Sequence, residues 1–429
     1  MQLKDFPSAG RFEAAEEAVI LPVGTGAVLD EGYAIDTVLE CCRGVAALWV
    51  FMFHISDMFE GVSPSLFALA SFGHYGVPLF FVISGYCMFA SAESTLSKRR
   101  SGADFLGRRC MRVLPPYWLS VLVVLATPFI IALISAAKSG RYEWPHTAWM
   151  AFSLADWVQV LTLTRAIFNG SDAAQAAFSP VNAVYWTLAI EMQFYLVLAA
   201  ALYFKSAWKR IVVAILCLSL ATLTWELISA AIFLRYWPAF VLGMALRVAH
   251  LKGLTPASVF GARETFLSLC GAILMLGGIF AVILLPMPLT LAHGPLAGIL
   301  GFTGVALASI LLLWVLGGVE HGIRNSRSRT QAERHAYWAL LPLCWVGQSS
   351  YSLYLLHGKI YQLPAMVLRQ FVPSQHLLFP LLTMMFTAAL CFAFYALFEK
   401  PFQHGGSFRL AGQRAAAAIV GRKGRFGRA

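Results

Sequence analysis

The feature that most constrains the fold is a series of apolar segments long enough to cross a lipid bilayer. A membrane-spanning helix needs about 20 apolar residues, because each residue advances the helix by about 1.5 Å. Hydrophobic residues occupy 59% of the 429 positions and charged residues only 12%, which excludes an ordinary soluble domain. We therefore predict an all-α, polytopic transmembrane helix bundle of about ten helices, at 37–59, 76–95, 113–137, 184–204, 211–229, 231–248, 265–286, 295–318, 339–360 and 377–398.

The distribution of basic residues predicts the orientation of this bundle. Loops on the cytoplasmic side of a membrane carry an excess of Lys and Arg. With both termini in the cytoplasm, all but six of the 32 Lys and Arg residues fall on the inner side, the exceptions being Lys138, Arg141, Arg165, Arg235, Lys359 and Arg369. The net charge of +11 is therefore read as a signal of topology, and we expect no nucleic-acid partner.

Three regions follow from composition. Residues 1–35 are polar and acidic, without the pattern of a signal peptide, and are expected to form a disordered cytoplasmic tail. Residues 36–402 form the predicted membrane domain, and 403–429 a basic cytoplasmic tail. Within the domain, 138–183 is a predicted outer loop. It contains an apolar stretch at 149–168 that includes Asp156 and Arg165, which favours an interfacial or re-entrant helix over an eleventh span.

The first apolar segment carries ionisable residues on one predicted helix face. Arg43 and His54 are eleven positions apart, which on an α-helix is three turns plus about 20°. Asp57 would follow one turn later and could hydrogen-bond the imidazole. Ionisable groups in a membrane are costly and usually mark function. The structural alternative is that Arg43 anchors the helix at the membrane surface and that His54 bonds a neighbouring helix.

Two further segments place polar residues in the outer half of the membrane. Glu191 lies in YWTLAIEMQFYL (185–196), at a depth where it could meet His54 or instead tie two helices together. His357 and Tyr354 lie in SSYSLYLLHG (349–358), on one predicted helix face. His357 could equally be an interfacial residue without a role in chemistry.

A basic cluster precedes the third predicted span. FLGRRCMRVLPPYW (105–118) carries Arg108, Arg109 and Arg112, and guanidinium groups bind phosphate oxygens two at a time. Lys400 near the end of the domain is a similar candidate. Orientation of the protein in the membrane explains such residues equally well. The eight cysteines show no metal-binding spacing, and we expect no metal site.

Taken together, these segments resemble the acyltransferase-3 family of integral membrane O-acyltransferases. The resemblance covers about residues 36–402. It rests on the R-x10-H spacing of Arg43 and His54 and on several segments in the same order: YGVPLFFVISGYCMF (75–89), FLGRRCMRVLPPYW with its RxxR, YWTLAIEMQFYL, SYSLYLLH (350–357) and FEKPF (398–402). It departs from the family pattern at Met192, where many members carry a second carboxylate.

The resemblance implies transfer of an acyl group, by default acetyl, from acyl-CoA to a hydroxyl of a carbohydrate. The acceptor would be a surface or exopolysaccharide glycan or its lipid-linked precursor, and the setting a bacterial inner membrane. His54 would be the catalytic base, or would carry the acyl group itself, with Glu191 or Asp57 supporting the imidazole. Acyl-CoA would be held by Arg43, Arg109, Arg112, Arg108 and Lys400. The substrate-binding candidates are His357, Tyr354, Tyr185, Trp186 and Ser84.

Two other functions remain open from the residues alone. A helical bundle with buried Arg, His and Glu could be a proton-coupled transporter or a glycan flippase, although the sequence lacks the repeated halves that many transporters show. The acceptor could also be a small secondary metabolite rather than a glycan.

Overall fold

The computed structural model describes residues 36–165, 171–223, 232–260, 295–325, 340 and 342–403. The described part is helical and contains no strand. The predicted tail 1–35, almost all of the tail 403–429 and the predicted span 265–286 lie outside the described residues. Each of the other predicted spans coincides with a helix, at least in part. These helices are α2 (Asp36–His54), α4 (Gly76–Ser97), α5 (Gly102–Ser139), α8 (Tyr185–Leu202), α9 (Trp208–Leu223), α10 (Ile232–Leu251), α14 (Pro295–Asn325), α16 (Ser350–Ile360) and α18 (Leu378–Phe394).

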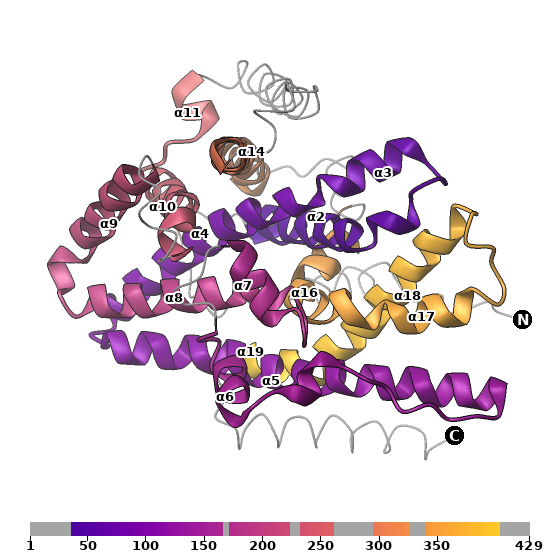
Figure 1. Cartoon of the computed structure of the whole chain (residues 1–429). Coiled ribbons are helices and arrows are strands. Elements are labelled where there is room, and N and C mark those ends of the chain that lie inside the picture. The colour runs from indigo at the N-terminus through magenta and orange to yellow at the C-terminus, as the bar shows by residue number, and fades with distance from the viewer. Residues whose placement is uncertain are drawn as a thin grey trace, which may run out of the picture.

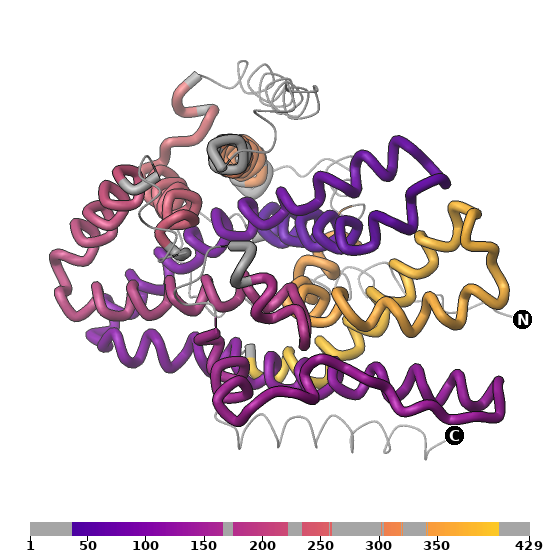
Figure 2. The backbone as a smooth tube through the Cα atoms, viewed as in Figure 1, coloured from indigo at the N-terminus to yellow at the C-terminus, as the bar shows by residue number. Residues whose placement is uncertain are grey.

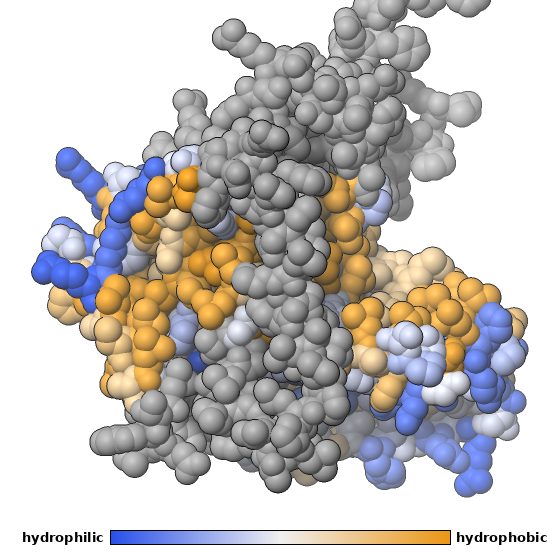
Figure 3. Space-filling view, turned by 90° about the horizontal axis from the view of Figure 1, so that it is seen from above, coloured by the Kyte–Doolittle hydropathy of each residue, from blue (hydrophilic) through white to orange (hydrophobic). Residues whose placement is uncertain are grey.

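Within the described residues, five stretches of helix are long and apolar enough to cross a membrane by themselves. They are Thr37–His54, Pro64–Ser97, Gly102–Ser139, Tyr185–Leu202 and Leu378–Phe402, and a shorter apolar helix covers Gly304–Gly318. Figure 3 shows apolar side chains over the middle of one face and hydrophilic ones gathered at its two ends, as expected for a protein surrounded by lipid. The chain is thus a membrane protein, while ten spans and cytoplasmic termini stay predictions.

Short elements connect the long helices. They are α3 (Pro64–Ser71), α6 (Leu154–Leu161), α7 (Ser171–Phe178), α11 (Pro256–Phe260), α17 (Gln362–Leu368), α19 (Lys400–Gln403), the 3-10 turns Ser56–Met58, Gly73–Tyr75, Ala148–Ala151 and Lys205–Ala207, and a π-helical turn at Tyr395–Glu399. In Figure 2, α17 and α18 lie at one end of the bundle and α9 and α10 at the other. The predicted outer segment, 138–183, contains α6 and α7, each of eight residues and too short to cross a bilayer.

Helix α5 begins earlier than the apolar pattern predicts. Ser101 and Asp104 form a capping box, in which the Ser101 hydroxyl accepts from Asp104 N at 3.1 Å and Ser101 N donates to Asp104 Oδ2 at 2.8 Å. The helix therefore starts at Gly102 and continues for 38 residues, and Figure 1 shows it running across the whole width of the molecule. As a result, the arginines of the RxxR segment lie on a helix and not in a loop.

Close packing of α4 and α10 depends on two glycines. A Cβ added at Gly85 would lie 1.9 Å from the carbonyl oxygen of Phe240, and one added at Gly243 would lie 1.9 Å from that of Val82. Small residues allow helix backbones to approach in membranes, where little hydrophobic force holds helices together. This contact fixes α4, which supplies one wall of the cavity described below.

Two buried carboxylates cap the N-termini of α2 and α16. Glu320 of α14 accepts hydrogen bonds from Thr37 N at 3.2 Å and Val38 N at 3.0 Å, at the start of α2. Glu399 accepts from Ser352 N at 3.0 Å and from the Ser352 hydroxyl, at the start of α16. The first N–H groups of a helix have no partner within it, and negative charge there is favourable. These contacts fix the ends of α2 and α16, the helices that carry His54 and His357.

Candidate active site

The interior of the bundle contains a cavity of about 400 Å³. Its walls come from α2, α4, α5, α8 and α16, and Phe402 also borders it. One side is basic, with Arg43, Lys98, Arg100, Arg108, Arg109 and Arg112 among the lining residues. Another part of the wall is polar and aromatic and includes Ser84, Glu191, Tyr195 and Tyr354. A volume of this size is typical of a small-molecule site.

The arginines of the cavity are held by contacts within the protein. Arg43 Nη1 lies 3.4 Å from Glu40 Oε1 in an ion pair. Arg108 Nη2 donates to Thr95 Oγ1 at 2.6 Å, and Arg109 Nη2 donates to the Cys87 carbonyl at 3.5 Å. The Arg109 guanidinium also lies 5.7 Å from the ring centre of Tyr195. Glu191 is the one carboxylate among the described lining residues, and the basic residues outnumber it, so the cavity has an excess of positive charge that suits a polyphosphate.

Glu191 lies on the polar wall of the cavity. Its Oε1 accepts a hydrogen bond from the Ser84 hydroxyl at 3.0 Å and a second, short one from the Tyr195 hydroxyl. Among the described contacts, Glu191 has no hydrogen bond to a histidine. The structure therefore brings Glu191 and Ser84 together, along with Tyr195, which stands one helical turn after Glu191.

His54 and His357 form a pair. Their ring centroids are 5.0 Å apart, and the centroid of the Phe51 ring lies 5.5 Å from that of His357. The fully buried His357 has Nδ1 at 2.9 Å from the carbonyl oxygen of Leu353. A carbonyl only accepts, so Nδ1 carries the proton, and Nε2 of the neutral ring is an acceptor. This Nε2 is buried and has no hydrogen-bond partner in the described part of the structure.

Tyr354 stands between the histidine pair and the cavity. It lines the cavity, and the centroid of its ring lies 6.2 Å from that of His357. Its hydroxyl donates a hydrogen bond to the Val184 carbonyl and also forms one with Thr187 Oγ1. Neither histidine is among the residues that line the cavity. The lining reaches Val50, one helical turn before His54 on α2.

The expected hydrogen bond between Asp57 and His54 is not found among the described contacts. The reason is local: α2 ends at His54, and the chain continues in a 3-10 turn at Ser56–Met58, so the helical spacing that would align the two side chains is lost. Asp57 is exposed.

Three other candidate residues lie away from the cavity lining. The buried Tyr185 has its hydroxyl 3.0 Å from Ser120 Oγ, and its ring packs edge-on against Tyr117. Trp186 packs 5.8 Å from Tyr236. Lys400 is exposed, whereas its neighbour Phe402 borders the cavity.

The sequence reasoning missed what Glu399 does. An acidic residue near the end of an apolar segment was a signal for a buried role, yet only the neighbouring Lys400 was selected. Lys98 and Arg100 were read as topology signals alone, although both border the cavity. In the described residues, no group of three or more His, Cys, Asp or Glu side chains could hold a metal ion.

Comparison with known proteins gives three findings. The family model described as "Acyltransferase domain" matches residues 36–398. The chain is 29% identical over 299 residues to the "Exopolysaccharide production protein ExoZ" of Rhizobium meliloti (strain 1021), covering 66% of this chain and 75% of that protein. It is 27% identical over 135 residues to "Nodulation protein 10" of Rhizobium leguminosarum bv. viciae, covering 32% of this chain and 35% of that protein. No solved structure matches significantly.

Proposed function

The chain belongs to the acyltransferase-3 family and is an acyltransferase of the membrane, and we propose that it transfers an acetyl group from acetyl-CoA to a hydroxyl of an exopolysaccharide. The observation that carries the donor part of the proposal is the basic wall of the cavity, with Arg43, Arg109 and Arg112. The name of the ExoZ relative supports the acceptor class.

The cavity suits acyl-CoA as the donor. Coenzyme A is polyanionic at one end and carries its thioester at the end of a long, thin arm. Arginines bind phosphate oxygens with two hydrogen bonds each, which gives them an advantage over lysine at such a site. The polar and apolar groups farther along the cavity, from Ser84 to Val50, would line the arm. The phosphate end would then lie among the arginines, and the thioester would lie toward Tyr354 and the histidine pair.

His54 is proposed as the general base. It accepts the proton of the acceptor hydroxyl as the oxygen attacks the carbonyl carbon of the thioester. A carbon–oxygen bond forms, the carbon–sulfur bond breaks, and the proton passes from the imidazole to the leaving thiolate. His357 contacts His54 directly and orients it, and Glu191 acts on the cavity wall through Ser84 and Tyr195.

The remaining parts of the proposal concern the setting. The protein would be a multi-pass protein of a bacterial inner membrane, with about ten spans and both termini in the cytoplasm. The acceptor would be the polysaccharide or its lipid-linked precursor. This arrangement would place the donor on the cytoplasmic side, where acyl-CoA is made, with the basic wall near that surface.

The test is a transfer assay with purified full-length protein in lipid nanodiscs. Acetyl-CoA labelled in the acetyl group is incubated with de-esterified exopolysaccharide, and the alkali-labile label in the polymer is counted. We expect label with the wild type and none above background with His54→Ala. Absence of ester in the wild type, together with a failure to bind acetyl-CoA, would reject the proposed function.

A further inference from the structure

A second cavity, of about 650 Å³, lies outside the proposed donor site. It is bordered by the second half of α5, by the segment between α5 and α8, and by the junction of α16 and α17. The residues that matter for its chemistry are Thr127, Thr147, Trp149, Ser179, Lys359 and Gln362. None of the residues predicted from the sequence as a site lines it.

The two cavities lie at different levels of the same helices. Arg112 and Thr127 of α5 line the first and the second cavity respectively, and fifteen residues of α-helix span about 22 Å. On α16, Tyr351 lines the first cavity and Lys359 the second, about 12 Å farther along. His357 lies between Tyr351 and Lys359 on α16, so the histidine pair stands between the two cavities.

The lining of the second cavity fits a sugar. Trp149 offers an indole ring on which the apolar face of a sugar ring can pack, and Gln362 and Ser179 offer hydrogen-bonding groups. Thr147 Oγ1 is buried and has no hydrogen-bond partner in the described part of the structure. A buried hydroxyl without a partner is costly in the empty protein and is satisfied when a ligand hydroxyl reaches it.

The positive charge of Lys359 makes this cavity better suited to an anionic sugar than to a neutral one. Lys359 is half-buried. Among the described residues it is the only ionisable side chain that lines the cavity, and it has no carboxylate partner there. A partly buried ammonium group without a counter-ion favours an anionic ligand. The matching group on a glycan is a carboxylate or a phosphate.

We infer that the second cavity binds the acceptor as a sugar residue that bears an oxyanion, with its ring on Trp149, its anionic group at Lys359 and a hydroxyl at Thr147. This rests on the proposed function and extends it by assigning a subsite and a substrate class. Donor and acceptor would then enter from different sides and meet at His54 and His357. Two sources of the oxyanion are chemically equivalent here: a uronic acid in the polymer, or the phosphate of a lipid-linked sugar.

The test measures binding of glycans without any donor, so that it does not depend on acyl transfer. Full-length protein in nanodiscs is titrated with a tetrasaccharide that contains glucuronic acid, with a neutral glucose tetrasaccharide, and with a prenyl-pyrophosphate-linked glucose. We expect one or both anionic ligands to bind at least about tenfold more tightly than the neutral one. A tenfold difference in affinity corresponds to the energy of one hydrogen bond to a charged group. Whichever anionic ligand binds identifies the source.

Variants then assign the site. Lys359→Met should weaken binding of the anionic ligand about tenfold and leave the neutral ligand unchanged, and Lys359→Arg should restore most of the loss. Trp149→Ala should weaken binding of both. Lys138→Met is the matched control, because Lys138 is an exposed lysine on α5 that lines neither cavity. Unchanged affinity for acetyl-CoA in each variant shows that the bundle is folded.

Two results would overturn the inference. One is equal affinity for neutral and anionic ligands. The other is an anionic preference that survives Lys359→Met. Either result leaves the proposed function standing if acetyl-CoA still binds and ester is still formed. Conversely, a wild type that binds the acidic tetrasaccharide through Lys359 but does not bind acetyl-CoA would retain this site and reject the proposed donor.

Discussion

The imidazole rings of His54 and His357 lie with their centroids 5.0 Å apart, although the two residues are far apart in the sequence. One ring ends α2 and the other sits in the last turns of α16, and both helices have their N-termini capped by buried carboxylates. The two histidines therefore lie near the C-terminal ends of α2 and α16, and the carboxylate caps fix the N-terminal ends of the same helices. It marks the place where we expect acyl transfer to occur.

Replacing His54 should abolish transfer without affecting donor binding. General base catalysis contributes about 10² to 10⁴ in rate, so His54→Ala should lower kcat at least about 100-fold. Because His54 does not line the cavity, the dissociation constant for acetyl-CoA should stay within about twofold of that of the wild type. Transfer kinetics and calorimetric titration of the same preparation measure both. A variant that retains wild-type kcat would show that another group is the base.

His357 should act as a positioning residue. Its Nδ1–H donates to the Leu353 carbonyl, so in the neutral form of the ring Nε2 is an acceptor beside His54. His357→Ala should lower kcat about tenfold, and the pH at which kcat is half-maximal should also shift, because the ring packed against His54 has changed. His357→Gln keeps a hydrogen-bonding side chain and should recover part of the rate. An unchanged pH profile in both variants would indicate that His357 only fills space.

Much of the fold was predictable because a membrane imposes strong periodicity and length. The apolar segments identify the long helices in the described part of the chain, and α4 and α8 differ from the predicted ranges by no more than a few residues. The start of α5 was not predicted because it is set by Ser101 and Asp104, two polar residues outside the apolar segment. Capping depends on a local hydrogen-bond pattern that hydropathy does not detect.

The site was predictable only in part. Arg109 and Arg112, one helical turn apart on α5, both line the cavity, whereas of Arg43 and His54 on α2 only Arg43 does. The sequence could not show that Glu191 would contact Ser84 rather than His54. The pairing of His54 with His357 depends on how α2 and α16 cross, which spacing along one helix does not determine. Asp57 was misplaced for a simpler reason, since the helix ends before it.

Replacing Arg109 should weaken donor binding more than it slows transfer. The Arg109 guanidinium lies at the cavity beside Tyr195, and we expect it to bind a phosphate group. Arg109→Ala should raise the KM for acetyl-CoA about tenfold with a change in kcat of less than about threefold. Arg210→Ala is the control, because Arg210 is exposed and does not line the cavity. If KM is the same in the two variants, Arg109 reflects membrane topology only.

Replacing Glu399 should destabilise the protein. Its carboxylate accepts from both Ser352 N and the Ser352 hydroxyl and is buried, so Glu399→Ala leaves two buried donors without their acceptor. The free energy of unfolding should fall by about 1–3 kcal/mol, and Glu399→Gln, which keeps an acceptor oxygen, should cost less. Denaturant unfolding in detergent, followed by helical circular dichroism, measures both. Glu60→Gln at an exposed position serves as the control and should change little. Equal stability of all three variants would show that the Glu399 cap contributes nothing.

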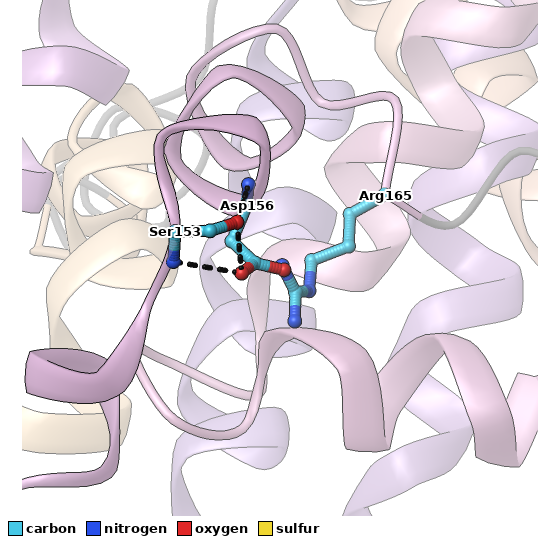
Figure 4. Close-up of polar contacts among 3 residues, drawn as sticks. All are labelled: Ser153, Asp156 and Arg165. Atoms are coloured by element: carbon cyan, nitrogen blue, oxygen red, sulfur yellow. Dashed lines mark hydrogen bonds and ion pairs between the residues drawn. The ribbon is translucent and has the colours of Figure 1, made fainter.

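The outer segment should lose a local contact in strong acid. Asp156 accepts hydrogen bonds from the Ser153 hydroxyl and backbone N–H and forms an ion pair with Arg165, as Figure 4 shows. These contacts lower the pKa of Asp156 to about 2, and the hydrogen bond from the Ser153 hydroxyl has the largest effect. A carboxylate with a lowered pKa stabilises the folded segment above its ordinary pKa of 3.8 and loses this effect as the pH falls to about 2.

Hydrogen exchange of residues 153–165, compared between wild type and Asp156→Asn at each pH, tests this directly. The wild type should be better protected at pH 7 and pH 5. The difference should shrink between pH about 4 and about 2, and it should disappear below that range because both side chains are then uncharged. The Asp156 side chain is partly exposed to solvent and its contacts are local, so the effect should be confined to this segment. Glu143→Gln, an exposed carboxylate change in the same outer segment, should match the wild type at every pH. A difference between wild type and Asp156→Asn that persists unchanged at the lowest pH would mean that the charge of Asp156 does not hold Ser153 and Arg165 in place.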